Sequence, residues 1–123
     1  MKTRILLVSS RLESNWATTL RDTLGFLGSL DVFLEDESKR QLLQKHYDLI
    51  IIDAGSVPSP AQLVAHMRAQ ESDARVVVVT LATTWREARE VFRAGAIDYF
   101  QRSMPKEEFV ARIHQALQLP LST

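Results

Sequence analysis

Five short runs of apolar, β-prone residues alternate with longer stretches of helical character along this chain of 123 residues. The first, third and fourth runs are almost entirely hydrophobic, which is typical of parallel strands that are buried on both faces. The second and fifth runs are more mixed, which favours the edges of a sheet. The runs cover residues 4–8, 30–34, 49–52, 76–80 and 97–100. This strict alternation predicts an α/β domain in which helices cover both faces of a parallel sheet.

The segments between the runs carry signals for the ends of helices. Capping boxes, in which two side chains satisfy unpaired backbone N–H groups at a helix start, are predicted at residues 10–13, 38–41 and 84–87. Ser59 with Pro60, and Pro105 with two glutamates after it, open two further helices. Gly95 is expected to end the fourth helix. Trp16 and the other aromatic residues are expected to lie in the core.

Right-handed crossovers between parallel strands leave few arrangements for such a domain. For five strands the common order is 2-1-3-4-5, that of a doubly wound, flavodoxin-like sheet. We expect residues 1–123 to form this single domain, with 119–123 as a tail or the stub of a linker. Functional groups in such sheets lie at the carboxyl ends of the central strands. The residues predicted there are Ser9, Ser10, Asp53, Thr80, Leu81 and residues 101–103.

Charge and composition exclude several classes of function. Basic and acidic residues number 15 each, for a formal net charge of +0, so we expect no general attraction to nucleic acid or to a membrane. The absence of cysteine excludes disulfides, thiolate metal sites and a cysteine nucleophile. His46, His66 and His114, expected on different helices, lack the spacing of a metal site. No apolar run reaches the ~18 residues of a membrane span, and the first residues do not resemble a secretion signal, so we expect a soluble cytoplasmic protein.

Three segments at the strand ends resemble the response-regulator receiver domains of bacterial two-component signalling. Residues 47–53 resemble the third strand of that family, which ends in the phosphoacceptor aspartate, here Asp53. Residues 76–80 and 95–100 are similar to the segments that carry the switch threonine and the switch aromatic, here Thr80 and Tyr99. The resemblance extends over residues 4–117. It implies phosphoryl transfer from a histidine kinase to the aspartate with bound Mg²⁺, and then repacking of the face formed by the fourth helix, fifth strand and fifth helix.

The chain departs from the family pattern around the phosphoacceptor position. Family members have two acidic residues after the first strand, where this chain has Ser9 and Ser10. Mg²⁺ is a hard ion that is usually held by one or two carboxylates together with neutral oxygens. We therefore expect no metal site, or at most weak Mg²⁺ binding at Asp53 and Gly55.

Two further departures concern the family's conserved lysine–proline pair, which corresponds to Arg102 and Ser103. A guanidinium offers a carboxylate a planar fork of donors, so we expect Arg102 to pair with Asp53 and to replace the missing metal charge. A cis bond to a residue other than proline costs ~3 kcal/mol. The bond between Arg102 and Ser103 is therefore expected to be trans.

Charged residues on the fourth and fifth helices form a candidate partner surface. Arg86, Arg89 and Arg93 recur at i, i+3 and i+7, which places them on one side of the fourth helix. Receiver domains use this region for dimers and partners, and the resemblance extends to charged positions of receivers that dimerise there. These positions are Asp98, Glu108 and Arg112. A solvated charged face is the alternative interpretation.

The leading hypothesis is a signalling and interaction module rather than an enzyme. It is an atypical receiver domain, phosphorylated weakly or not at all, whose partners are a histidine kinase, an output domain or another receiver, including a second copy. One alternative is a conventional Mg²⁺-dependent receiver phosphorylated on Asp53. Another is a nucleotide- or flavin-binding domain on the same sheet, but the sequence contains neither G-x-G-x-x-G nor a P-loop.

Overall fold

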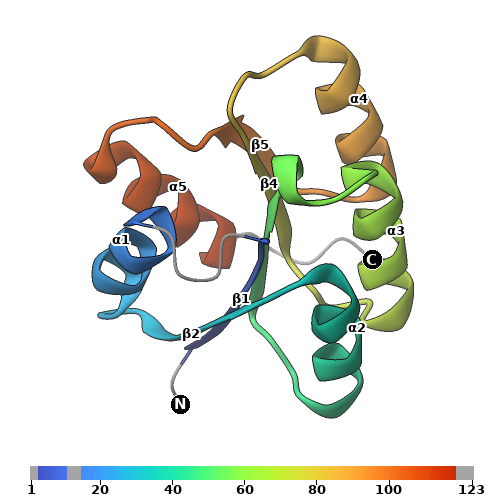
Figure 1. Ribbon diagram of the computed structural model, residues 1–123, viewed down its shortest axis with the longest axis horizontal. Helices are drawn as coiled ribbons and strands as arrows, with labels where there is room; N and C mark the ends of the chain where they lie inside the picture. Colours follow the sequence, from blue (N-terminus) through green and yellow to red (C-terminus); the bar gives the residue numbers. More distant parts are fainter. Residues whose placement is uncertain (1–2, 11–14, 119–123) are drawn as a thin grey trace.

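The computed structural model describes residues 3–10 and 15–118, in which five strands alternate with five α-helices (Figure 1). The strands are β1 (Thr3–Val8), β2 (Gly28–Phe33), β3 (Leu49–Asp53), β4 (Val76–Thr80) and β5 (Asp98–Gln101). The helices are α1 (Asn15–Leu24), α2 (Glu35–Gln44), α3 (Pro60–Gln70), α4 (Trp85–Ala94) and α5 (Lys106–Gln118), and a short 3-10 turn, η1 (Ala54–Ser56), follows β3. The predicted tail at 119–123 lies outside the described residues.

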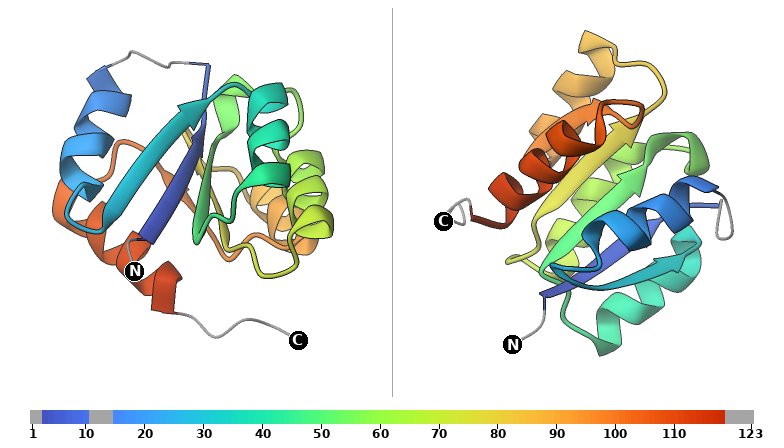
Figure 2. Two further views of the ribbon diagram at one scale, coloured as in Figure 1. Left: turned by 90° about the horizontal axis from the view of Figure 1, so that it is seen from below. Right: turned by 90° about the vertical axis from the view of Figure 1, so that its left-hand side faces the viewer.

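The five strands form one parallel sheet in the order β2-β1-β3-β4-β5, which confirms the predicted topology. Helices α1 and α5 cover one face of the sheet, and α2, α3 and α4 cover the other (Figures 1 and 2). The two mixed runs form the edge strands β2 and β5, as expected. The carboxyl ends of β1, β3 and β4 lie side by side, because Val8 pairs with Ile52 and Asp53 pairs with Val79.

Two hydrophobic clusters, one on each face of the sheet, form the core. Every residue of β3 and β4 is buried, which explains their almost continuous apolar sequence. The cluster under α2, α3 and α4 contains Tyr47, Met67 and Val91. The cluster under α1 and α5 contains Leu24, Phe109 and Ile113. Packing on both faces fixes the sheet, and thus the positions of the side chains at its carboxyl edge.

Two of the three predicted capping boxes can be compared directly with the structure. Thr84 caps α4 by accepting a hydrogen bond from the backbone N–H of Glu87, as predicted. The prediction at residues 38–41 is wrong, because α2 begins three residues earlier and Ser38 is buried inside it. Its first turn holds Glu35, Asp36 and Glu37, whose negative charges stabilise a helix N-terminus. The box at 10–13 lies partly outside the described residues.

The other end signals are confirmed. Ser59 accepts a hydrogen bond from the backbone N–H of Gln62, with Pro60 in the first turn of α3. Gly95 follows α4 in the left-handed conformation, with φ of 117°. This region is open to glycine but unfavourable for other residues. Gly95 therefore turns the chain into β5.

The prediction that the aromatic residues lie in the core is wrong for three of them. Phe26 and Trp85 are 71% and 72% exposed, and Phe92 is 47% exposed. Trp16 is partly buried and packs against the cluster under α1 and α5. His46 lies in the loop between α2 and β3 rather than on a helix.

Candidate functional site

Asp53 is the last residue of β3, and its carboxylate is buried at the carboxyl edge of the sheet. The residue is 2% exposed. Its Oδ2 atom accepts a hydrogen bond from Ser9 Oγ at 2.9 Å and another from Ser56 Oγ at 2.8 Å. Ser9 is itself buried at the end of β1, and Ser56 lies in η1. The carboxylate is thus held by hydroxyl donors from two separate segments of the chain.

Arg102 reaches the same carboxylate from the loop after β5. Its Nη1 atom lies 3.7 Å from Asp53 Oδ2, and its side chain is mostly buried. The distance is that of an ion pair and exceeds that of a hydrogen bond, so the structure brings the two residues together without a bidentate fork. The guanidinium also lies over the ring of Trp16, 5.1 Å from its centroid. This stacking helps to fix the position of the charge. The bond between Arg102 and Ser103 is trans, as expected.

Ser10 and Gly55 complete the surroundings of Asp53. Ser10 is exposed, and its Oγ donates to Ser56 Oγ at 3.0 Å. Gly55 lies in η1. A Cβ at this position would lie 3.9 Å from Asp53 Oδ1, which is an ordinary van der Waals distance, so the space around it does not require glycine. The network therefore runs from Ser10 through Ser56 to the carboxylate.

Sequence reasoning missed Ser56. The sequence gives only a weak signal for Ser56, which is a hydroxyl residue three positions after the carboxylate that ends the strand. It lies in a loop whose conformation the sequence does not specify. The 3-10 turn η1 brings Ser56 back to Asp53.

Thr80 and Tyr99, the predicted switch residues, lie on β4 and β5, and the hydrogen bonds of their hydroxyls are made with groups other than Asp53. Thr80 ends β4, is 8% exposed, and donates to the carbonyl of Ala82 at 3.3 Å. The Tyr99 hydroxyl donates to Glu87 Oε1 at 2.7 Å and accepts from the backbone N–H of Thr84 at 3.2 Å. Burial raises the pKa of Tyr99, and the hydrogen bond to Glu87 raises it further. Tyr99 thus joins β5 to the first turn of α4.

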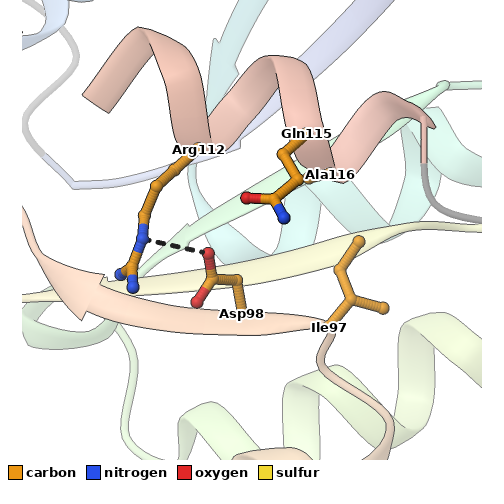
Figure 3. Close-up of a pocket in the computed structure, with 5 residues that line it drawn as sticks. All are labelled: Ile97, Asp98, Arg112, Gln115 and Ala116. Atoms are coloured by element: carbon orange, nitrogen blue, oxygen red, sulfur yellow. Dashed lines mark ion pairs between the residues drawn. The ribbon is translucent and has the colours of Figure 1, made fainter. Parts of the chain in front are cut away.

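Two of the candidate partner residues, Asp98 of β5 and Arg112 of α5, line a pocket of about 250 Å³ (Figure 3). Arg112 Nε lies 3.6 Å from Asp98 Oδ2, and its guanidinium lies over the ring of Phe100. Glu108 is exposed on the same helix. The structure therefore brings Asp98 and Arg112 together as a pair.

The three arginines of α4 are exposed. Arg89 stacks on Trp85, with its guanidinium carbon 4.6 Å from the ring centroid. Arg89 and Glu87 are two residues apart and so point to nearly opposite sides of the helix. Because Glu87 reaches Tyr99 on β5, Arg89 lies on the side of α4 away from β5.

The described part of the chain contains neither a cluster of metal ligands nor a membrane-spanning helix. Within residues 3–10 and 15–118, no cluster of three or more His, Cys, Asp or Glu side chains is arranged to hold a metal ion. Over the same part of the chain, no helix has both the length and the hydropathy to cross a membrane.

No family model matches the sequence, but it is similar to a curated protein. The two-component response regulator PhoP of Pseudomonas aeruginosa is 30% identical over 84 residues. The match covers 67% of this chain and 37% of that protein. The chain therefore spans well under half the length of this relative.

Solved structures with this fold include response regulators and their receiver domains. A response regulator from Thermotoga maritima has a TM-score of 0.83 at 19% identity, covering 97% of this chain and 100% of that one. An orphan response regulator of H. pylori has a TM-score of 0.84 at 22% identity, covering 94% of this chain and 97% of that one. A CheY-like receiver domain from Methanospirillum hungatei has a TM-score of 0.84 at 16% identity, covering 95% and 94%. The predicted receiver fold is confirmed.

Proposed function

We propose that this chain, which has the fold of two-component response-regulator receiver domains, is an atypical receiver that signals through protein contacts and does not depend on phosphorylation. The observation that carries the proposal is the state of Asp53, the residue at the phosphoacceptor position. Its buried carboxylate already has two hydroxyl donors and an arginine charge within reach. These partners supply hydrogen-bond donors and the positive charge that a bound cation would otherwise supply.

The side chains around Asp53 are a poor match for Mg²⁺. This ion favours octahedral sites with one or two carboxylates and retained waters. Here the two positions after β1 are Ser9 and Ser10, which leaves one carboxylate beside neutral hydroxyls. A positive guanidinium 3.7 Å from that carboxylate repels a divalent cation. We therefore infer that Mg²⁺ binding is weak or absent at this site, and we assign no reaction step to it.

The output of the domain is expected to run through the α4-β5-α5 face. Asp98 and Arg112 already form an ion pair across β5 and α5, next to the exposed Glu108. Tyr99 ties the start of α4 to the same strand. A histidine kinase, an output domain or a second receiver, including a second copy of this chain, are the classes of partner that this face would serve. Its role is to bind rather than to catalyse, and we propose that residues 1–123 act as one receiver unit.

Treatment of the purified domain with acetyl phosphate and Mg²⁺, followed by intact-mass spectrometry, tests this function. We expect no gain of a phosphoryl group, because the inferred weakness of Mg²⁺ binding leaves the charge that develops in phosphoryl transfer without a metal to neutralise it. Asp53→Asn serves as the matched control, since it removes the acceptor. A mass gain that disappears in Asp53→Asn would establish the alternative, a conventional receiver phosphorylated on Asp53.

A further inference from the structure

Helix α4 carries an apolar stripe on the side away from β5. Trp85 and Phe92 are seven residues apart, two turns of the helix, and so lie on one side. They are 72% and 47% exposed. Ala88, one turn from each of them, is partly buried and packs against the core cluster beneath α4. The stripe therefore runs along the edge of the buried face of the helix.

The neighbouring side of α3 is lined with small residues. Ala61, Ala65 and Arg68 share one side of α3, since they recur at i, i+4 and i+7. Arg68 lies against Gly95 at the end of α4, where an added Cβ would be 3.1 Å from Arg68 Nε. The side of α3 that faces α4 is thus the one with Ala61, which is partly buried, and Ala65, which is exposed. Helices α3 and α4 lie side by side in Figures 1 and 2.

The stripe is bordered by positive charge. Arg86, Arg89 and Arg93 are all exposed on α4, and within residues 3–10 and 15–118 none of them takes part in an ion pair with a carboxylate. Arg89 lies over the ring of Trp85. Elsewhere in the same ranges, Lys39, Arg40 and Arg112 do form such pairs.

We propose that this surface, formed by Trp85, Arg89 and Phe92 of α4 with Ala61 and Ala65 of α3, binds an acidic amphipathic helix of a partner protein. The apolar side of such a helix would pack on Trp85 and Phe92, above the small alanines. Its carboxylates would pair with the arginines of α4. Exposed aromatic and arginine side chains that become desolvated on binding are the residues that contribute most to binding in protein interfaces.

The observations favour a peptide over a nucleic acid. Binding of single strands uses open aromatic faces for base stacking, whereas Arg89 already covers one face of Trp85. The chain as a whole has no net charge, and phosphate backbones are bound chiefly by an excess of positive charge. The surface is also separate from Asp53 and from the pair formed by Asp98 and Arg112, so a test of it does not depend on the function proposed above.

Titration of the ¹⁵N-labelled domain with two helical peptides tests the proposal. Both peptides carry leucines along one side; the remaining positions are glutamate in one and lysine in the other. We expect saturable binding of the glutamate peptide only, with a shift of the Trp85 indole signal and none of the Trp16 signal. The same titration is made with a single-stranded oligonucleotide. The protein alone is measured at the same concentrations to detect self-association.

Three variants decide where the glutamate peptide binds. Trp85→Ala and Arg89→Glu should each weaken it about tenfold or more, as truncation of an interface anchor does. Phe26→Ser removes an equally exposed aromatic from the turn after α1 and should leave the affinity unchanged. Circular dichroism checks that all three are folded.

Four results would overturn the proposal. They are no saturable binding of the glutamate peptide, equal binding of the lysine peptide, tighter binding of the oligonucleotide, and self-association of the protein that Trp85→Ala abolishes. The last would assign the surface to contacts between copies of this chain.

Discussion

Asp53 is a carboxylate buried in a place where water cannot solvate it. A buried charge is tolerated only if it is paired and hydrogen-bonded. Here two hydroxyls meet the hydrogen-bonding requirement at 2.8 and 2.9 Å, and Arg102 supplies the opposite charge at 3.7 Å. In the function proposed above, the same three groups take the place of the cation that a conventional receiver would bind.

The two serines after β1 are predicted to differ in their effect on stability. Ser9→Ala removes a donor to a buried carboxylate and should lower the free energy of unfolding by about 1–3 kcal/mol. Ser10→Ala should change it by no more than ~0.5 kcal/mol, since Ser10 is exposed and Ser56 keeps its bond to Asp53. Urea denaturation of the two variants measures both values. If Ser9→Ala lowers the free energy of unfolding as little as Ser10→Ala does, Ser9 does not hold the carboxylate.

At the scale of elements, the hydroxyl of Tyr99 joins β5 to the start of α4. Thr84 caps α4 with its side chain, but the reciprocal half of the predicted capping box is replaced. Glu87 accepts from Tyr99 instead, and Tyr99 in turn accepts from the backbone N–H of Thr84. The start of α4 is therefore coupled to β5, the strand that begins with Asp98 and leads to Arg102.

Alkaline pH should weaken this connection. Burial, and then the hydrogen bond to Glu87, raise the pKa of Tyr99, so the folded state holds the phenolic proton more tightly than the unfolded state. Its contribution to stability is complete below about pH 10, the ordinary pKa of tyrosine, and is lost as the pH rises further. Burial also raises the pKa of Tyr47, which donates to Asp31.

Tyr99→Phe isolates the contribution of Tyr99. The variant should be less stable at neutral pH by about 1 kcal/mol, for the loss of the hydrogen bonds, and its stability should fall less steeply above about pH 10 than that of the wild type. Thermal unfolding of the wild type and of Tyr99→Phe is measured at a series of pH values on both sides of about pH 10. Both proteins retain Tyr47. Parallel curves would show that Tyr99 has no linked ionisation.

For the molecule as a whole, the sheet was the most predictable part. Strands β3 and β4 are apolar except for their last residues, Asp53 and Thr80, because both faces of each strand are covered. Runs of this kind are typical of the centre of a parallel sheet. The alternation with helices then fixes the topology. The edge positions of β2 and β5 followed from their mixed sequences.

Local details were less predictable where two signals compete. Ser38 fits a cap pattern, but the acidic residues just before it extend α2 towards its N-terminus. Trp85 and Phe92 are aromatic, yet their helical phase places them beside the buried face rather than within it. Residue type alone does not give that phase.

The candidate site likewise has one part that the sequence predicts and another that depends on the conformation of loops. That Asp53 and Arg102 come together could be anticipated, because both follow strands that end at the same edge of the sheet. The part played by Ser56 could not, since it depends on the turn η1. The length of the guanidinium contact likewise depends on the loop after β5 and on the stacking of Arg102 on Trp16.

The central claim is that hydroxyls and a guanidinium stand where a cation would bind, and calorimetric titration with Mg²⁺ tests it most directly. The comparison is between the wild type and a variant carrying Ser9→Asp, Ser10→Asp and Arg102→Lys, with Asp53→Asn in each background as the control. We predict no saturable binding to the wild type across the millimolar range, and saturable binding to the triple variant that Asp53→Asn abolishes. Saturable binding of Mg²⁺ to the wild type, lost in Asp53→Asn, would contradict the account.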